Sequence, residues 1–173
     1  FLRVGELWAL EWRDVVSIEE TVDESNVPVS LVHLEVRKEI SKVRARRRVI
    51  SRGGEYFQRL RRNSQHTEPS DFLFASVNGK QPLNRRKWYL HWKNLMYGIG
   101  IENYADRKLT WYSLRHFGIT CRIRAKVPMA DISKIAGTSV SHIETHYGHY
   151  DDEMLKSTAL KNFTVTSSGI KLT

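Results

Sequence analysis

The chain has 173 residues, a formal net charge of +9 at pH 7 and a pI of about 9.8. Its length suffices for one domain with a hydrophobic core, and no apolar run is long enough to span a membrane. The charge favours a polyanionic partner, most commonly nucleic acid, because an excess of Lys and Arg attracts phosphate. An anionic membrane surface fits less well, since the positive charge is not gathered on one amphipathic helix.

Two local features concern the setting of the chain. Cys121 is the single cysteine, which excludes an internal disulfide framework and predicts an intracellular protein. Its neighbours Ile119 and Ile123 predict that the thiol is buried. The chain begins with Phe1 inside a segment of helical character, so we expect an N-terminally truncated fragment.

The first part of the chain predicts a helix followed by a small sheet. Within residues 3–12, Trp8 and Trp12 stand four residues apart, which is the spacing of one helical face. Residues 31–37 alternate between apolar and polar side chains, as a half-buried strand does. Three strands are expected, at residues 15–18, 31–37 and 44–50, and they would form a three-stranded antiparallel sheet.

The rest of the chain is predicted to be mainly helical, so the fold class is α+β. Gly137 lies just past the end of one apolar segment, and Ser139 or Ser141 can cap the next helix, the latter with Glu144 as a capping box. An extended piece is expected at 71–76 and a polar tail at 163–173. The expected helices cover residues 54–62, 83–97, 111–126, 128–136, 140–147 and 151–161.

A run of cations lies in the third expected strand and its approach. Lys42, Arg44, Arg46 and Arg48 fall at every second residue, and in a strand they would share one face. Four cations repel one another unless an anion lies there, and a two-stranded ribbon can enter a DNA groove. The alternative is a solvated edge strand whose positive charge blocks aggregation.

A second basic cluster opens the helix expected at 83–97. Asn84 can cap this helix, and Arg85, Arg86 and Lys87 occupy its first turn. Cations at this end oppose the helix dipole, whereas a bound phosphate would reverse that balance. A merely solvated basic turn is an equally good interpretation.

Trp88, Trp92 and Leu95 lie on one face of the same expected helix. Aromatic side chains can stack on the bases of single-stranded nucleic acid. Helical spacing of apolar residues is, however, typical of a face that packs into the core. We therefore predict a core face.

The histidines near the end of the chain suggest a metal site only superficially. His142, His146 and His149 have a suitable spacing, but Ile143 stands where the zinc protease motif requires Glu. No cysteine or carboxylate cluster completes a tetrahedral site. We therefore expect no metal and no cofactor.

Tyr147 lies between two histidines, and alone it would be read as a packing residue with a satisfied hydroxyl. A nucleophilic tyrosine needs cations that favour its oxyanion. Arginines suit a phosphodiester target because their planar fork donates two parallel hydrogen bonds, and a lysine can protonate the leaving oxygen. Arg3, Arg115 and Lys42 are the candidates, although spacing alone does not assemble them.

Over nearly its whole length the chain resembles the tyrosine recombinases, specifically the phage-type integrases. Residues 1–12 are similar to the first box of that family, with Arg3 on its first arginine and Glu6 on a buried acidic residue that supports the site. Lys42 lies in the basic hairpin setting of the family's lysine. Residues 112–116 resemble the second box, with Arg115 on its second arginine.

The last motifs of this resemblance end at the nucleophile. Residues 136–139 resemble the segment that precedes it, and Tyr147 falls on the nucleophile itself, nine residues after Thr138. Two positions differ from the commonest pattern: Tyr112 stands where the family usually has His or Lys, and Thr138 where it usually has His or Trp. Both hydroxyls can still donate to a phosphate oxygen. The resemblance also implies supporting roles for His116 and Gly137.

The resemblance implies a mechanism. Tyr147 attacks the scissile phosphate, forms a 3′-phosphotyrosyl link and releases a 5′-hydroxyl. Arg3 and Arg115 stabilise the transition state, while Lys42 protonates the leaving oxygen. The reverse reaction with another strand exchanges partners without ATP or metal.

The resemblance also implies a setting. The partner is double-stranded DNA that carries an attachment site, bound as a tetramer, with a monomer or weak oligomer in its absence, accessory DNA-bending proteins and no membrane. The location is the cytoplasm, at the nucleoid of a bacterial or phage-infected cell. Residues 1–160 would form the catalytic domain, and the tail 161–173 would be exchanged between protomers.

Two alternatives remain at this stage. A type IB topoisomerase-like relaxase shares the chemistry, although the first box favours an integrase. A catalytically degenerate DNA-binding domain of a defective prophage integrase is the other, with Thr138 as its main support.

Overall fold

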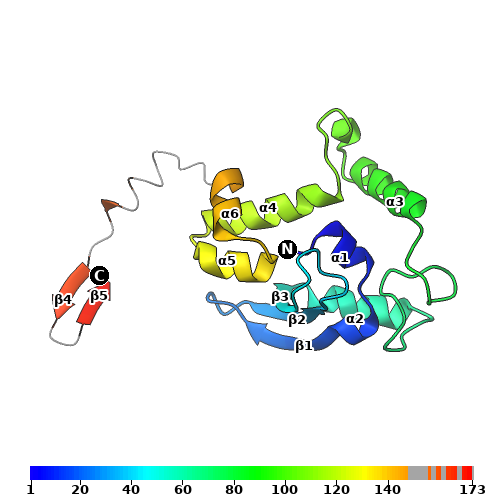
Figure 1. The fold of residues 1–173 in the computed structure, drawn as a ribbon, viewed down its shortest axis with the longest axis horizontal. Coiled ribbons are helices and arrows are strands. Elements are labelled where there is room, and N and C mark those ends of the chain that lie inside the picture. The colour runs from blue at the N-terminus through cyan, green and yellow to red at the C-terminus, as the bar shows by residue number, and fades with distance from the viewer. Residues whose placement is uncertain (148–155, 157–158, 161–162, 167–168, 173) are drawn as a thin grey trace. The chain divides into compact units, whose positions relative to one another are not determined.

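Figure 1 shows the computed structural model, which describes residues 1–147, 156, 159–160, 163–166 and 169–172. The chain divides into two compact units, residues 1–138 and residues 139–173. The first unit combines a small sheet with helices, which confirms the predicted α+β class. None of the helices in the described part of the chain has both the length and the apolar character needed to cross a membrane.

The first unit is built on the expected three-stranded antiparallel sheet, and the strand order is β1-β2-β3. The central strand pairs with both neighbours: Leu34 lies opposite Val15 on one side and opposite Val49 on the other. The strands are β1 (Val15–Val22), β2 (Pro28–Val36) and β3 (Arg47–Arg52).

The third strand begins three residues later than predicted, at Arg47. The backbone of Arg44 has a φ of 50°, in the left-handed region, and its N–H closes a turn onto the carbonyl three residues earlier at 3.0 Å. An extended run cannot continue through that conformation. The prediction of one basic strand face is therefore wrong: of Lys42, Arg44, Arg46 and Arg48, only Arg48 lies in β3.

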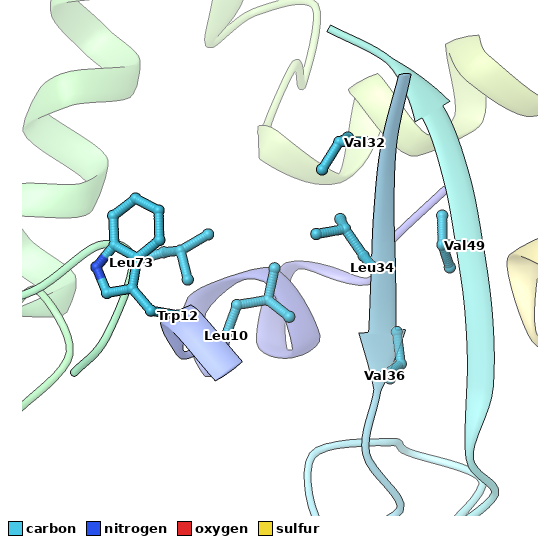
Figure 2. Close-up of a cluster of buried hydrophobic side chains, with 7 residues drawn as sticks. All are labelled: Leu10, Trp12, Val32, Leu34, Val36, Val49 and Leu73. Carbon is cyan, nitrogen blue, oxygen red and sulfur yellow. The ribbon is translucent and has the colours of Figure 1, made fainter. Parts of the chain in front are cut away.

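The core lies against one face of this sheet (Figure 2). Alternation along β2 buries Val32, Leu34 and Val36, and Val49 lies beside them on β3. Leu10 is fully buried in the same cluster. Each such aliphatic side chain contributes about 1.5–3 kcal/mol when it leaves water. Trp12 and Leu73 complete the cluster, and Phe57 and Leu60 from α2 (Gly54–Asn63) pack at its margin.

The single helix expected over residues 3–12 is wrong. The chain forms a short helix α1 (Val4–Trp8) and then a 3₁₀ turn η1 (Trp12–Asp14). Between them the backbone pairs with a distant segment, because the Leu73 N–H donates to the Leu10 carbonyl at 2.9 Å. The piece expected to be extended at 71–76 forms isolated bridges rather than a strand. Trp8 and Trp12 donate their indole N–H groups to different partners, the carbonyls of Leu83 and His66.

The longest helices lie within two residues of their expected bounds. α3 buries Trp88, Trp92 and Met96, and both indoles lie against Trp111, with ring centroids 4.8 and 4.9 Å apart. This confirms the core interpretation, except that Leu95 is exposed and Met96 takes its place. The helices are α3 (Arg85–Gly98), α4 (Trp111–Arg124) and α5 (Met129–Ala136), with a 3₁₀ turn η2 (Glu102–Tyr104).

Caps fix where these helices begin and end. The Asn84 side chain accepts from the N–H of Arg86 at 2.8 Å, as predicted. Thr110 caps α4, and Gly137 ends α5 with a φ of 61°. The prediction for Cys121 is wrong, because its thiol is exposed. α4 buries positions four residues apart, which are Arg115, Ile119 and Ile123, and Cys121 does not belong to that set.

The second unit begins with α6 (Val140–Tyr147), whose bounds match the prediction. Its cap is Ser139, whose hydroxyl accepts from the N–H of His142 at 3.1 Å. The segment predicted only as a polar tail forms a hairpin, with β4 (Phe163–Thr166) antiparallel to β5 (Gly169–Leu172). The helix expected at 151–161 falls mostly outside the described residues, as do Gly148 and His149.

Candidate active site

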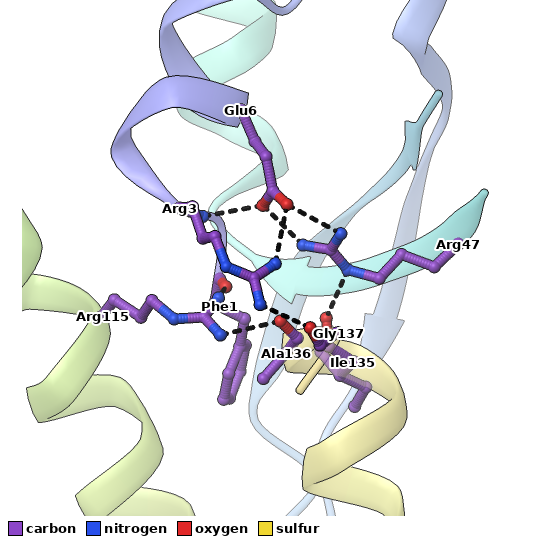
Figure 3. Close-up of polar contacts among 8 residues, drawn as sticks. All are labelled: Phe1, Arg3, Glu6, Arg47, Arg115, Ile135, Ala136 and Gly137. Atoms are coloured by element: carbon purple, nitrogen blue, oxygen red, sulfur yellow. Dashed lines mark hydrogen bonds and ion pairs between the residues drawn. The ribbon is translucent and has the colours of Figure 1, made fainter. Parts of the chain in front are cut away.

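Four charged side chains from α1 and its N-cap, β3 and α4 meet in the first unit (Figure 3). Arg3 precedes α1, Glu6 lies on α1, Arg47 begins β3 and Arg115 lies on α4. Glu6 is 1% exposed and Arg115 is 5% exposed. Charges this deeply buried are stable only when they are paired, so their mutual contacts decide what the cluster can do. We call these four residues the arginine cluster.

The Glu6 carboxylate is the centre of the cluster. Its Oε1 accepts from Nη1 of Arg3 and from Nη1 of Arg47, both at 3.0 Å. Its Oε2 accepts from Nη2 of Arg47 at 2.6 Å and from the backbone N–H of Arg3 at 2.8 Å. Burial alone would raise the pKa of Glu6, but the hydrogen bonds from Arg47 and from the Arg3 backbone lower the pKa below its ordinary value. Glu6 is therefore an ionised carboxylate.

The C-terminal end of α5 supplies the other acceptors. The last carbonyls of a helix have no partner within it and carry partial negative charge. Here three consecutive carbonyls each accept from a different arginine (Figure 3). The pairs are Arg47 Nε with Ile135 O at 3.2 Å, Arg115 Nη2 with Ala136 O at 2.8 Å and Arg3 Nη2 with Gly137 O at 2.6 Å.

Gly137 fits this position for two reasons. Its φ of 61° is in the left-handed region that disfavours a side chain. A Cβ at this position would also lie 2.8 Å from the Arg47 guanidinium. The arginine thus lies directly on the backbone of the turn that ends α5.

Positive charge exceeds negative charge in the cluster. Arg115 also donates to the Phe1 carbonyl, and within the described part of the chain its side-chain bonds go to carbonyls and to no carboxylate. Burial, and next to it the nearby charge of Arg3, lower the pKa of Arg115. An anion bound between Arg3 and Arg115 would relieve this repulsion. Both side chains can donate to such an anion, because each guanidinium has five N–H donors and only some are engaged.

A groove of about 810 Å³ borders the cluster and brings Lys42 to it. Arg3 and Glu6 line the groove on one side, and Lys42 and Arg44 line it through the loop before β3. Lys42 is exposed, so its amine can reach a ligand in the groove. The remaining lining residues are Gly5, Lys38, Glu39, Ile40 and Ser41.

The two positions that depart from the family pattern lie on segments that carry the cluster. Tyr112 is on α4, three residues before Arg115, and its half-exposed ring packs edge-on against His116 with centroids 4.7 Å apart. Thr138 directly follows Gly137, and its N–H donates to the Ser133 carbonyl at 3.1 Å.

Tyr147 is the last residue of α6 and belongs to the second unit, whereas the arginine cluster belongs to the first. The rings of His142 and His146, one turn apart on α6, stack with centroids 4.0 Å apart. His146 Nδ1 also hydrogen-bonds the His142 carbonyl at 3.0 Å, which indicates a local helical contact.

The predicted DNA-binding cations are exposed but not equivalent. Arg46 forms an ion pair with Glu35 of β2, with Nε–Oε1 at 2.5 Å. This pair raises the pKa of Arg46 and neutralises part of the hairpin's charge. Arg85, at the start of α3, lies over the Trp8 ring at 5.5 Å. The other exposed members are Arg44, Arg48, Arg86 and Lys87.

Sequence reasoning missed Arg47. A signal was present in the run 44–48, because Arg47 has the same strand parity as the buried Val49, whereas Arg48 points to the other face. A buried arginine requires a carboxylate, and Glu6 was the one already expected to be buried. The carbonyls at the end of α5 gave no signal, since backbone acceptors do not depend on residue type.

Most of the chain is similar to a known protein family. The family model described as "Phage integrase family" matches residues 1–154. The match includes the arginine cluster, Lys42, Thr138 and Tyr147. No curated protein and no solved structure matches the chain.

Proposed function

This chain belongs to the phage integrase family, and on that premise we propose that it is a site-specific DNA recombinase that cleaves and rejoins strands through a 3′-phosphotyrosyl intermediate. The observation that carries the proposal is the pairing of Arg3 and Arg115. The two residues are far apart in the sequence, yet Arg3 donates to the Gly137 carbonyl and Arg115 to the adjacent Ala136 carbonyl. Two forks held this way suit the two non-bridging oxygens of one phosphate.

The proposed chemistry is a displacement at phosphorus. The Tyr147 hydroxyl loses its proton to solvent, and its oxygen forms a bond to the scissile phosphorus as the bond to the 5′ oxygen of deoxyribose breaks. Lys42 donates the proton that the leaving oxygen takes up. Arg3 and Arg115 stabilise the charge on the non-bridging oxygens of the transition state. The covalent link retains the phosphodiester energy, so a second 5′-hydroxyl reverses the steps without ATP, metal or cofactor.

Auxiliary donors complete the proposed site. Tyr112 lies on the helix that carries Arg115, and Thr138 follows the turn that holds Arg3, so their hydroxyls are suited to donate to the same phosphate. A hydroxyl carries no charge, and a charge-assisted bond is roughly twice as strong as a neutral one. We therefore infer slower cleavage than a histidine at position 138 would give. Glu6, His116 and Gly137 support the site without contacting the phosphate.

Double-stranded DNA is the proposed partner, bound as a tetramer on its attachment site. The groove beside the arginine cluster, which Lys38, Lys42 and Arg44 also line, supports this proposal. The net charge of +9 is consistent with a phosphate backbone as ligand. The tail 161–173 is proposed to pack on a neighbouring protomer of that assembly.

A trapping experiment tests the function even when the attachment site is unknown. The protein is incubated with fragments of genomic DNA from its source cell that carry random nicks. Cleavage close to a nick releases a short strand, so the covalent adduct cannot reverse. Adducts are recovered under denaturing conditions, and the sequenced DNA defines a suicide duplex. Peptide mass spectrometry is expected to find a nucleotide on Tyr147, with the 5′-hydroxyl of the released strand open to phosphorylation.

The controls separate the competing functions. Tyr147→Phe is expected to give no adduct, and an undiminished adduct with this variant would refute the nucleophile assignment. A wild-type protein that binds the DNA without any adduct would be a degenerate DNA-binding domain. Relaxation of a supercoiled plasmid that lacks the trapped sequence would instead favour a topoisomerase-like relaxase.

A further inference from the structure

Arg47 is the one residue of the arginine cluster to which the proposed function assigns no role. Its side chain is 9% exposed, and all three of its nitrogens are engaged. Nη1 and Nη2 donate to the two oxygens of Glu6, and Nε donates to the carbonyl of Ile135. Every nitrogen of its guanidinium is thus bonded to the protein, and little of the side chain is accessible to a DNA phosphate. Its position is that of a residue that acts through its neighbours.

We propose that Arg47 is a positioning residue that keeps the fork of Arg3 open toward the scissile phosphate and fixes the spacing between Arg3 and Arg115. This inference rests on the proposed function, because it concerns how the same phosphate is held.

Arg47 and Arg3 share the hydrogen bonds to the Glu6 carboxylate unequally. Arg47 holds Glu6 through both of its terminal nitrogens, at 3.0 and 2.6 Å. Arg3 holds the carboxylate by one side-chain nitrogen only, Nη1 at 3.0 Å, and its Nη2 donates to the Gly137 carbonyl. A lone arginine beside a buried carboxylate prefers the two-bonded fork geometry. Because Arg47 occupies that geometry, Arg3 does not turn both terminal nitrogens onto Glu6.

Arg47 also contacts the C-terminal end of α5. Arg47 Nε donates to the first of the three carbonyls that receive the arginines, and its guanidinium lies against the backbone of Gly137. The next two carbonyls hold Arg115 and Arg3. β3 contacts α5, and Arg47 provides a polar link between these elements. A change at Arg47 therefore alters the platform on which both phosphate-binding arginines rest.

Removing Arg47 is expected to change the surroundings of both Glu6 and Arg3. Glu6 would keep its charge in a buried position with half of its hydrogen-bond donors gone. Arg3 is the nearest remaining cation and would rotate onto the carboxylate, away from Gly137 and from a bound phosphate. Displacement of a reacting group by about 1 Å can lower a rate about 100-fold. DNA affinity is expected to depend less on Arg47, because Arg47 is almost buried whereas the exposed Lys42 and Arg44 line the groove and are accessible to phosphates.

The kinetic test compares Arg47→Met and Arg47→Lys with Arg52→Met. Arg52 lies on the same strand and has an exposed ion pair with Asp23 at 3.0 Å, so its loss controls for removing an arginine from β3. Adduct formation with the trapped suicide duplex is followed under single-turnover conditions over a range of DNA concentrations. We expect the maximal rate constant to fall about 100-fold in Arg47→Met. The DNA concentration at half-maximal rate is expected to change less than about threefold.

The other variants sharpen the test. Arg47→Lys keeps the charge but cannot make two parallel bonds, and is expected to restore only about a tenth of the wild-type rate constant. Arg52→Met is expected to react as wild type. A merely structural role would lower the fraction of protein that reacts while leaving the rate constant of that fraction unchanged. Such a result in either Arg47 variant would overturn the proposal, and Arg47→Lys decides the matter if Arg47→Met does not fold.

A structural measurement separates this inference from the proposed function. In the crystal structure of Arg47→Met, or of Arg47→Lys if the former does not fold, Arg3 is expected to hold both Glu6 oxygens and to leave the Gly137 carbonyl. An Arg3 side chain that stays on Gly137 would overturn the positioning role whether or not an adduct forms. If wild type forms no adduct but Arg3 moves as expected, the proposed reaction fails while the positioning role stands.

Discussion

Glu6 carries one negative charge, and two arginines share it. The division is unequal, with a fork from Arg47 and a single side-chain bond from Arg3. Since the carboxylate is almost inaccessible to water, breaking the pair would leave a buried charge uncompensated. Arg115, among the described residues, bonds to carbonyls and to no carboxylate. At the scale of single residues, the site therefore combines a fixed anion, shared by Arg3 and Arg47, with a third arginine, Arg115, that no carboxylate among the described residues neutralises.

The shared carboxylate makes stability depend on pH. The pKa of Glu6 is lowered in the folded protein, so its ionised form contributes stability above its unfolded value of about 4.3, and this contribution is lost as pH falls through the folded pKa. Glu6→Gln is expected to lower the free energy of unfolding by about 3 kcal/mol at pH 7. Urea denaturation at pH 7 and near pH 3 measures the effect. The difference between the two proteins should shrink in acid, and a constant difference would contradict the ionic role.

Arg115 is expected to need its shape as well as its charge. Arg115→Lys keeps the positive charge but loses the fork that donates to Ala136 and, in the proposed reaction, to a phosphate oxygen. The maximal rate constant of adduct formation should fall about 100-fold, as when one transition-state donor is removed. Arg124→Lys is the control, since Arg124 is exposed in the last turn of the same helix. Equal rate constants for the two variants would exclude a specific role for the fork.

At the scale of elements, the end of α5 is the feature on which the site depends. The turn at Gly137 presents carbonyls to three arginines, and its backbone conformation disfavours a side chain. The position of α5 is in turn fixed by its contacts with β3 and α4. A defect in this turn should therefore reach the chemistry as well as the stability.

Gly137→Ala tests this turn, and Gly118→Ala in α4 is a comparison whose expected effect on stability has the opposite sign. Gly137→Ala places a Cβ at a φ of 61° and 2.8 Å from Arg47, and should lower stability by about 1–2 kcal/mol and slow adduct formation. Gly118→Ala, in the middle of α4 with nothing within 4 Å of the added Cβ, should raise stability by about 0.5–1 kcal/mol. Thermal melting measures both. A neutral Gly137→Ala would show that the turn tolerates a side chain.

The sequence predicted elements well where periodicity and caps agree. The alternation in β2 identified a strand, although it begins at Pro28 and not at residue 31, and the Asn84 cap and Gly137 placed two helix ends correctly. It failed where a long-range contact decides the local structure. Leu10 leaves the helical path because its carbonyl pairs with Leu73, and nothing near Leu10 in the sequence encodes that partner.

The candidate site was predictable to the same degree. Glu6 and Arg115 were expected from motifs, and the structure brings both together with Arg3. Arg47 was missed, because the cations at alternate positions around it indicate a solvent-exposed face of the strand, to which Arg47 does not belong. The roles of Tyr147 and Lys42 remain predictions, because a motif indicates a residue type at a position and not the path of a proton.

At the scale of the whole molecule, the excess of positive charge predicts how binding responds to salt. Arg44 lines the groove, whereas the charge of Arg46 is partly neutralised by Glu35. Each phosphate contact releases about one counterion, so the slope of log affinity against log salt reports how many contacts form. The two arginines should therefore differ although they stand two residues apart.

Fluorescence anisotropy with a labelled duplex over a series of salt concentrations measures this difference. Arg44→Ala is expected to weaken binding and to reduce the slope by about 1. Arg46→Ala should reduce the slope by less, because an existing ion pair must break before Arg46 can contact a phosphate. Equal slopes for Arg44→Ala and wild type would remove Arg44 from the DNA interface.

The carbonyls at the end of α5 have a consequence for how the protein can change over generations. Each arginine there recognises a peptide group, and every residue type supplies the same peptide oxygen. The side chains at positions 135 and 136 are thus free to drift under packing constraints alone, without disturbing the carbonyls that hold the arginines. Selection for activity should fall on the arginines and on the one glycine whose conformation aims the oxygens, so a diverging lineage can keep its chemistry while its sequence around the site becomes hard to recognise.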